Sequence, residues 1–303
     1  MTLAKLKLKM NKELKIKKID IADKEYPKQL EKNANPPKVL YYRGNLNALN
    51  YKYSVAVVGT RRCSQYGKEA TRQITKKLSQ AGVTIISGLA RGVDTWAHRT
   101  ALEYGAPTIA VLGTGVDDKS LYPKQNLLLA HKIINENGLI VSEYEEGTQG
   151  FPGNFPARNR IVAALSDAIL VTEAPLKSGA LITAEFAKKY NKKVYAVPGS
   201  IFSRLSSGTN YLLQNGANVT VNGEIILKDL GVKKQSQQEN LKLNLNELEF
   251  MVLKLIKDAP TAMHIDKIIQ KVKVDFSEVL VAVTSLVLND LIKEAGTDTY
   301  IAT

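Results

Sequence analysis

The sequence predicts an α/β protein: an extended Rossmann-like, doubly wound and mostly parallel sheet, followed by a small C-terminal winged-helix domain. Two observations predict it. Between residues 53 and 221, short uninterrupted apolar segments alternate with amphipathic helical patterns. After residue 245, apolar residues recur at helical spacing through three segments that end in a hairpin-like pattern. Strands buried on both faces lose the alternation of apolar and polar residues, so the first pattern is typical of a parallel sheet covered by helices on both sides.

The predicted strands of the sheet follow one another along the chain, each rich in β-branched or aliphatic residues. They cover residues 53–58, 83–87, 107–112, 138–142, 168–172, 193–197 and 218–221. Helical patterns lie between them at residues 66–80, 93–104, 124–136 and 179–190.

Composition divides the chain into four segments. A basic N-terminal segment covers residues 1–25, and the Rossmann-like domain is expected to cover 26–230. Residues 231–244 are polar and lack apolar periodicity, which is typical of a linker. Residues 245–303 form the small domain. Its helices are predicted at 246–257, 263–272 and 276–290, and its hairpin turns near Gly296.

Several functional classes are disfavoured by composition. The chain has no run of about 18 apolar residues, as a membrane span requires, and its basic N-terminus lacks the apolar stretch of a secretory signal. We therefore expect a cytoplasmic protein without membrane contact. The single cysteine, Cys63, excludes an internal disulfide, and His98, His131 and His264 are too scattered to suggest a metal cluster. No metal and no cofactor are expected.

The net charge of +13 is distributed unevenly. Residues 1–18 contribute +6 and residues 246–303 contribute −3, so residues 19–245 carry +10. A region this basic attracts polyanions or anionic surfaces. The alternative is that the lysines lie on solvated faces and have no partner. This alternative accounts for the lysines equally well, but it does not account for arginines inside glycine-rich turns.

Glycine-rich turns follow most of the predicted strands. Ligands of open parallel sheets bind beyond the carboxyl ends of the strands, where these turns lie. Glycine lets the backbone approach an anion, and a helix N-terminus that follows favours negative charge. A tight turn also needs glycine without any ligand, but repetition along one edge favours an anion crevice. The turns are GTRR (59–62), SGLARGVD (87–94), GTGVD (113–117), EYEEG (143–147), EAPLKSGA (173–180) and PGSIFSRLSSGTN (198–210).

These turns, together with FPARNRIVAALSD (155–167) and GVDTWAHRTAL (92–102), closely resemble the DNA-processing protein A (DprA/Smf) family. The resemblance runs from YPKQLEKNANPPKVLYYRGNL at residue 26 to about residue 227. It implies a homodimer that binds single-stranded DNA, protects incoming strands and loads the RecA recombinase during natural transformation.

The family's DNA-binding turn carries over to Gly59, Thr60 and Arg61, with Arg62 beside it. A long polyanion suits guanidinium groups that grip successive phosphates, whereas a nucleotide cofactor needs a bare glycine loop. Further contacts expected on the same surface are Arg158, Asn159, Arg160, Lys177 and Arg204.

Phe155 is expected to provide a stacking platform for a base, a contact worth about 1–3 kcal/mol in proteins that bind single strands. The alternative for Phe155 is a core aromatic residue.

No catalytic residues are expected. Asp94 and His98 suggest acid–base chemistry, but helix capping and a core hydrogen bond explain them more simply. Glu143, Glu145 and Glu146 are expected to be solvated or ion-paired.

Two other functions compete with DNA binding by the central domain. The first is a nucleotide hydrolase of the lysine-decarboxylase-like Rossmann group, whose members use a PGGxGTxxE turn. Here Ser200 replaces the second glycine, and Asn210 is followed by Tyr211 without the glutamate. The second is a sequence-specific transcription factor that reads DNA through its winged helix, which the −3 charge of residues 246–303 disfavours.

Overall fold

The computed structural model describes residues 15–31, 35–232, 245–289 and 291–302. The chain divides into two compact units, Met1–Lys233 and Lys234–Thr303. Most of the predicted linker and residues 1–14 of the basic N-terminal segment lie outside the described residues. Residues 17–20 of that segment form a strand of the large sheet, so this sheet begins before residue 26, where the sequence analysis placed the start of the domain.

The first unit is built on a nine-stranded sheet in the order β1-β2-β6-β5-β4-β3-β7-β8-β9. The strands from β6 to β9 in this order pair in parallel, and the edge pair β1 and β2 is antiparallel. The predicted mostly parallel sheet is therefore confirmed. The strands are β1 (Lys17–Asp20), β2 (Val39–Gly44), β3 (Ser54–Val58), β4 (Thr84–Ser87), β5 (Thr108–Leu112), β6 (Leu139–Ser142), β7 (Ala168–Val171), β8 (Lys193–Ala196) and β9 (Asn218–Val219).

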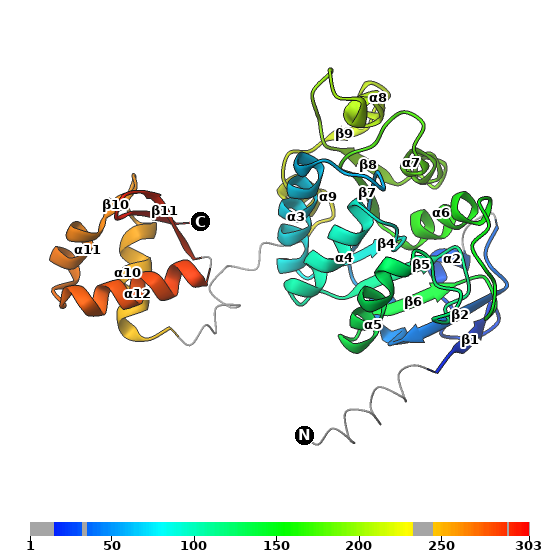
Figure 1. Ribbon diagram of the computed structural model, residues 1–303, viewed down its shortest axis with the longest axis horizontal. Coiled ribbons are helices and arrows are strands. Elements are labelled where there is room, and N and C mark those ends of the chain that lie inside the picture. The colour runs from blue at the N-terminus through cyan, green and yellow to red at the C-terminus, as the bar shows by residue number, and fades with distance from the viewer. Residues whose placement is uncertain (1–14, 32–34, 233–244, 290, 303) are drawn as a thin grey trace. The chain divides into compact units, whose positions relative to one another are not determined.

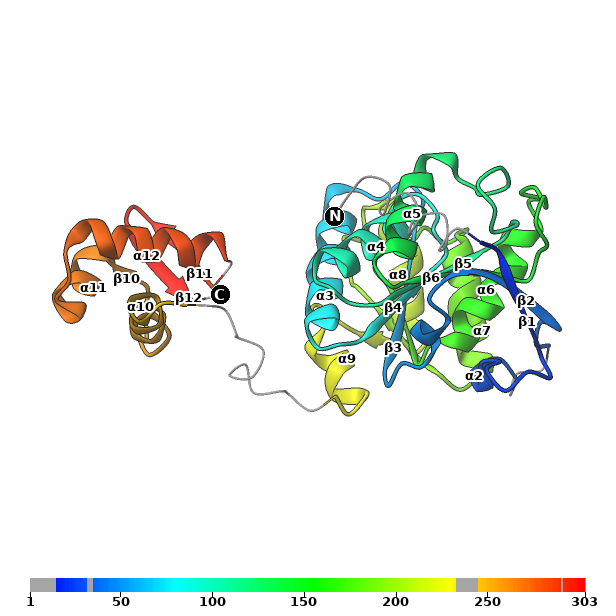
Figure 2. The same ribbon diagram turned by 90° about the horizontal axis from the view of Figure 1, so that it is seen from below.

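Helices cover both faces of this sheet, as the uninterrupted apolar strands predict (Figures 1 and 2). Alternate residues of one strand point to opposite faces, so Val55 and Val57 of β3 pack with α3 and α4, while Ala56 and Val58 pack with α6 and α7. The helices are α2 (Lys28–Glu31), α3 (Gln65–Gln80), α4 (Val93–Glu103), α5 (Leu127–Asn135), α6 (Asn154–Leu165), α7 (Gly179–Lys189), α8 (Ser207–Gln214) and α9 (Glu224–Asp229), with 3-10 turns η1 (Leu46–Leu49), η2 (Lys124–Asn126) and η3 (Arg204–Ser206).

The order of the strands reverses between β3 and β7. From β3 the chain moves outward through β4, β5 and β6, and α6 then crosses back to β7 on the other side of β3. The connections that leave the carboxyl ends of β3 and β7 therefore run in opposite directions. Open α/β sheets bind their ligands at this point.

The second unit packs three helices against a small sheet of order β10-β12-β11. Its elements are α10 (Glu247–Lys257), β10 (Met263–His264), α11 (Ile265–Val272), α12 (Phe276–Leu288), β11 (Ile292–Gly296) and β12 (Thr299–Ala302). Asn246 and Glu249 form a capping box at the start of α10. The second unit has its own core, which includes Val252, Ile268 and Leu286. The three predicted helices and the hairpin are present, although residues 263–264 form a strand rather than the first turn of α11.

Candidate functional site

The turn that follows β3 presents two arginines while its backbone is tied to the protein. Thr60 is buried, its amide donates to the carbonyl of Glu173 (2.7 Å), and its own carbonyl accepts from Val93 N (3.2 Å). The Thr60 hydroxyl accepts from the amide of Arg62 at 3.3 Å. Arg61 and Arg62 are exposed. Thr60 therefore shapes the turn, and the two arginines remain available to a ligand.

Two glycines let this turn pack tightly on its neighbours. A Cβ on Gly59 would lie 2.5 Å from a Val93 methyl and 2.7 Å from the carbonyl oxygen of Glu173. Gly92 has a φ of +74°, and a Cβ there would collide with the Thr60 carbonyl oxygen and lie 2.7 Å from the carbonyl carbon of Arg61. The turns after β3 and β4 are thus interlocked, and side chains at these two positions would push Arg61 away.

Glu173 holds the start of α3 in place. Its buried carboxylate accepts from Ser64 N (2.8 Å) and Ser64 Oγ (2.6 Å). The same hydroxyl caps α3 by accepting from Gly67 N. Because Glu173 follows β7 and Ser64 follows β3, these bonds join the two strands between which the sheet reverses.

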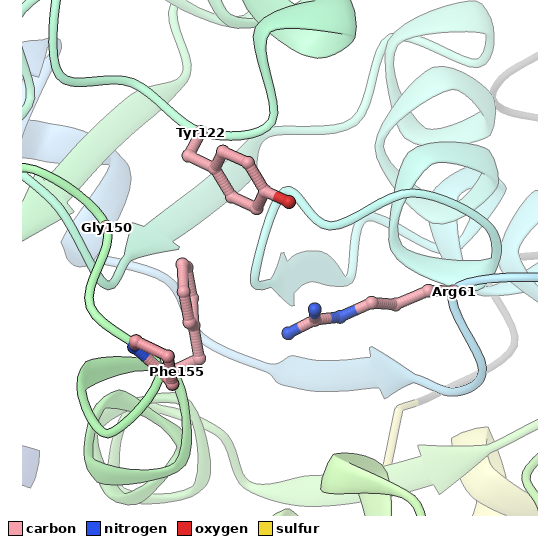
Figure 3. A pocket seen from close by; sticks show the side chains of 5 residues that line it. Arg61, Tyr122, Gly150 and Phe155 are labelled. Carbon is pink, nitrogen blue, oxygen red and sulfur yellow. The ribbon is translucent and has the colours of Figure 1, made fainter.

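Phe155 lines a pocket beside the Arg61 turn (Figure 3). Its ring packs close to Gly113 and Gly150, where an added Cβ would lie 3.0 Å and 3.1 Å from ring atoms. The Arg61 guanidinium lies 5.4 Å from the centroid of the Phe155 ring, and the Tyr122 ring lies 5.6 Å from it, tilted by 48°. Phe155 is half-buried, so the core alternative does not describe it.

The pocket has a volume of about 350 Å³. Arg61, Tyr122, Gly150, Pro152 and Phe155 line it, and they come from the loops after β3, β5 and β6 and from α6. The sequence analysis did not find Tyr122, Gly150 or Pro152. Gly150 and Pro152 follow the turn after the strand at 138–142, but nothing in the sequence shows that Tyr122 reaches the same point.

Arg158 is not on the surface where the sequence analysis expected it. It is only 5% exposed, and its Nη1 donates to the carbonyls of Gly88 (2.9 Å) and Val111. A Cβ on Gly88 would collide with this guanidinium, which explains that glycine. Burial lowers the pKa of Arg158 to about 10, so it stays charged at neutral pH. Its place in the structure is that of an internal cation joining the loop after β4 to the end of β5.

Arg160 is also occupied within the protein. Its guanidinium forms a bidentate ion pair with Glu143, at 2.6 Å and 3.1 Å, and its side chain is 14% exposed. This pairing corresponds to the ion-paired alternative expected for Glu143. Glu145 accepts from the hydroxyl of Tyr41 at 2.7 Å.

Lys177 and Arg204 lie in the turns after β7 and β8, and Asn159 reaches the first of these turns from α6. Asn159 Nδ2 donates to the carbonyl of Gly179 (2.9 Å), in the turn that carries the exposed Lys177. The amide of Leu176 donates to Ser207 Oγ (3.2 Å), which donates to the carbonyl of the exposed Arg204 (2.7 Å). The two turns are therefore neighbours, but no contact joins their cations to the Arg61 pocket within the described residues.

Asp94 and His98 are structural residues. The buried Asp94 carboxylate accepts from Gly88 N (3.0 Å) and Ala90 N (3.3 Å), so it orders the loop before α4 rather than capping the helix itself. Burial raises the pKa of Asp94, and the charge of Arg158 opposes that shift. His98 Nδ1 bonds with the Thr108 hydroxyl at 2.7 Å, and burial lowers the His98 pKa to about 3.

Metal-binding chemistry finds no support in the part of the chain that the structure describes. Groups of three or more His, Cys, Asp or Glu side chains able to hold an ion do not occur among these residues. No helix of the described segments is long and apolar enough to cross a membrane.

Comparison with known proteins identifies the family that this chain resembles over most of its first unit. A family model described as DNA recombination-mediator protein A matches residues 17–231. The chain is 46% identical over 212 residues to Protein Smf of Synechocystis, 69% of this chain but only 52% of that protein. It is 42% identical over 215 residues to DNA processing protein DprA of Streptococcus pneumoniae, covering 71% of this chain and 74% of that one.

Two solved structures have the same fold over most of the chain. The X-ray structure of DNA processing protein A from Streptococcus pneumoniae aligns with a TM-score of 0.66 and 38% identity, over 74% of this chain and 77% of that one. DNA processing protein A from Helicobacter pylori, described for its unique single-stranded DNA binding mode, aligns with a TM-score of 0.64 and 35% identity, over 72% of this chain and 96% of that one.

Proposed function

This chain belongs to the DNA recombination-mediator protein A family, and we propose that it binds single-stranded DNA along the carboxyl edge of its large sheet. The observation that carries the proposal is the pocket in which Arg61 lies 5.4 Å from the Phe155 ring. It pairs an exposed cation with an aromatic face at one point. A nucleotide unit of a single strand offers the matching groups, a phosphate and an unpaired base.

The division of labour in the pocket follows from its residues. A base stacks on the exposed part of the Phe155 ring, with Tyr122 beside it, while Arg61 grips the adjacent phosphate. Gly59 and Thr60 hold the backbone so that Arg61 points into the pocket, and Arg62 contacts a neighbouring phosphate. Stacking tolerates any base because every base has a π-face, so the binding is sequence-tolerant.

The pocket favours a single strand over a duplex. A base in a duplex is stacked on both faces and must be extruded before it can enter a pocket, which costs a few kcal/mol. The strand continues past Asn159 toward Lys177 and Arg204, whose turns are joined through Ser207. Arg158 supports this edge from within, and Arg160 is held by Glu143.

The biological role we propose is that of the mediator described for the family. The protein acts as a homodimer that protects incoming single strands and loads the RecA recombinase onto them during natural transformation. The family's designation as a recombination mediator and the single-stranded DNA binding of the Helicobacter pylori relative support the mediator and DNA-binding parts of this role. The chain spans about half the length of Protein Smf of Synechocystis, so we assign the role to residues 17–231, where the family model matches.

The nucleotide-hydrolase alternative has less support. In the turn after β8, the Asn210 side chain bonds both the amide and the carbonyl of Gly199, at 3.2 Å and 3.0 Å. The glycine turn that would have to receive a phosphate is thus bonded to a side chain of the helix that follows it, α8. We therefore propose a binding protein without turnover.

A test of the pocket is the substitution Phe155→Ala. Loss of one stacking contact, worth about 1–3 kcal/mol, predicts an affinity for oligothymidylate that is lower by about five- to a hundredfold. Phe250→Ala in the second unit is the matched control, because that ring is 60% exposed and belongs to α10. Equal affinities of the Phe155→Ala protein and the control in fluorescence anisotropy would exclude the pocket as the base site.

A further inference from the structure

A second basic and aromatic surface lies on the outer side of α3 and α4, which pack side by side (Figures 1 and 2). Both helices begin at the edge that carries the pocket, because α3 follows the Arg61 turn and α4 follows the turn of Gly92. They run away from that edge in the same direction. The first side chains on the facing sides of these two helices therefore lie next to the candidate site.

Cations recur at every turn of α3 on the side that faces α4. Lys68, Arg72 and Lys76 are spaced four residues apart, so they lie on one side of the helix. The Lys68 Nζ lies 4.4 Å from the centroid of the Trp96 ring, and the Lys76 Nζ lies 5.0 Å from that of Tyr104. We name these residues, together with Arg99, the α3–α4 stripe.

Arg99 adds a cation from α4 itself. Its guanidinium lies 5.4 Å from the Trp96 ring, and it is exposed. Among the described residues, Arg72 pairs with two carboxylates, Glu69 at 3.9 Å and Glu103 at 3.7 Å. Lys68 and Arg99 each lie over the Trp96 ring, so Lys68, Arg72 and Arg99 together outnumber these two carboxylates. Cation–π contacts at exposed sites are worth only about 0.5–1 kcal/mol, so Lys68 and Arg99 can turn to a phosphate at small cost.

The end of the stripe nearest the start of α3 is continuous with the pocket. The exposed Arg62 precedes α3, and the exposed Arg91 precedes α4. Their two turns are in contact, because a Cβ on Gly92 would collide with the backbone at Thr60 and Arg61. Positive charge thus extends from the Arg61 pocket over these turns to Lys68 and Trp96.

We propose that the α3–α4 stripe is a second contact for single-stranded DNA, which carries the strand onward after its base has entered the Phe155 pocket. This proposal rests on the proposed function and extends its footprint. Alternating cations and aromatic rings are the combination used by proteins that bind single strands without sequence preference. From Lys68 to Lys76 the stripe rises about 12 Å along α3, which matches about three or four nucleotides of a stacked strand.

Trp96 provides a direct test, because it is the only tryptophan in the chain. Its fluorescence is recorded while the full-length protein is titrated with oligothymidylates of about four and about sixteen nucleotides. We expect the longer strand to change the Trp96 emission and the shorter one, which fills the pocket alone, to leave it unchanged. Unchanged Trp96 emission with a bound long strand would overturn the proposal.

A charge variant tests the same surface by affinity. Lys68→Gln combined with Arg99→Gln should weaken binding of the long strand about tenfold and reduce the salt slope by about 1.4, since each phosphate contact of a single strand contributes about 0.7. Binding of the short strand should not change. The matched control, Lys28→Gln with Lys189→Gln, removes the same charge from exposed positions on α2 and α7, across the sheet.

The two proposals fail in different ways. If neither strand binds, the proposed function fails and the stripe with it. If both strands bind through Phe155 and the stripe variant equals its control, only the stripe proposal fails, and the cations of α3 and α4 face another partner such as an acidic protein. Thermal unfolding is measured for each variant. A melting curve like that of the parent shows that a loss of affinity comes from the lost contact and not from a change in folding.

Discussion

At the scale of single residues, arginines from similar motifs serve different purposes. Arg61 extends into the pocket, Arg158 bonds two buried carbonyls, and Arg160 is paired with Glu143. Arg61 follows a predicted strand, whereas Arg158 and Arg160 both belong to α6, and the residue type alone does not show which of them is exposed. The packing of α6 on the sheet buries Arg158 and brings Arg160 to Glu143, while Arg61 stays exposed in its turn.

Arg158→Ala is predicted to destabilise the fold. The carbonyls of Gly88 and Val111 would lose their donor, and a buried polar group left unpaired costs about 1–3 kcal/mol. Arg61→Ala, at an exposed position, should change stability by no more than about 0.5 kcal/mol. Urea unfolding measures both free energies. An Arg158→Ala protein as stable as Arg61→Ala would show that the internal bonds contribute nothing.

His98 is predicted to make the protein less stable in mild acid. Its pKa is lowered by burial to about 3 in the folded state, against 6.5 for a free side chain. As the pH falls below about 6.5, the unfolded chain binds a proton that the folded one does not, so the free energy of unfolding decreases by up to about 1.4 kcal/mol per pH unit. His98→Gln should show a shallower decrease between about pH 6.5 and pH 5, measured by urea unfolding. For His264→Gln, in the second unit, the free energy of unfolding should decrease with falling pH as it does for the parent. Equal slopes for the parent, His98→Gln and His264→Gln would contradict the assignment.

At the scale of elements, the uninterrupted apolar strands were sufficient to predict the parallel part of the sheet, and the glycine-rich turns to predict the edge at which its connections gather. The strand β3, for example, is buried at all five positions, as its composition predicts. The strands β1 and β2 were not predicted: Lys17–Asp20 lies in a basic segment, and β2, although its valine and tyrosines favour a strand, precedes the regular alternation of strands and helices that begins at residue 53. The place of Tyr122 in the pocket was not predicted, because it depends on how a long loop folds back, and no local sequence pattern encodes that.

Gly92→Ala is predicted to disturb both stability and DNA binding. Its positive φ alone costs about 1–2 kcal/mol with a side chain, and the new Cβ would also displace the turn of Thr60 and Arg61. Gly105→Ala separates the two effects, because Gly105 has a φ of +67° but open space around a Cβ. We expect both variants to lose stability, and only Gly92→Ala to lose DNA affinity as well. Equal DNA affinities would show that the interlocked turns do not position Arg61.

At the scale of the whole molecule, charge separates the two units. Residues 1–233 carry +15 and residues 234–303 carry −2. In the second unit, α12 contains no lysine or arginine and exposes apolar residues such as Phe276 and Val281. This helix has little to offer a phosphate backbone.

Truncation after residue 240 is therefore predicted to leave single-strand affinity nearly unchanged. The first unit has its own cores and contains every residue proposed to contact DNA. Dissociation constants of the full-length and truncated proteins at one salt concentration measure the difference. A loss of more than about tenfold, or 1.4 kcal/mol, would make the second unit a principal DNA reader.

The central claim is that this edge of the sheet binds single strands through phosphates and stacked bases. Titration of the full-length protein with matched single- and double-stranded oligonucleotides at several salt concentrations tests it most directly. The predicted result is tighter binding of the single strand, with a logarithmic affinity that falls by about 0.7 per contacted phosphate for each tenfold increase in salt. A preference for the duplex, or an affinity that does not respond to salt, would contradict it.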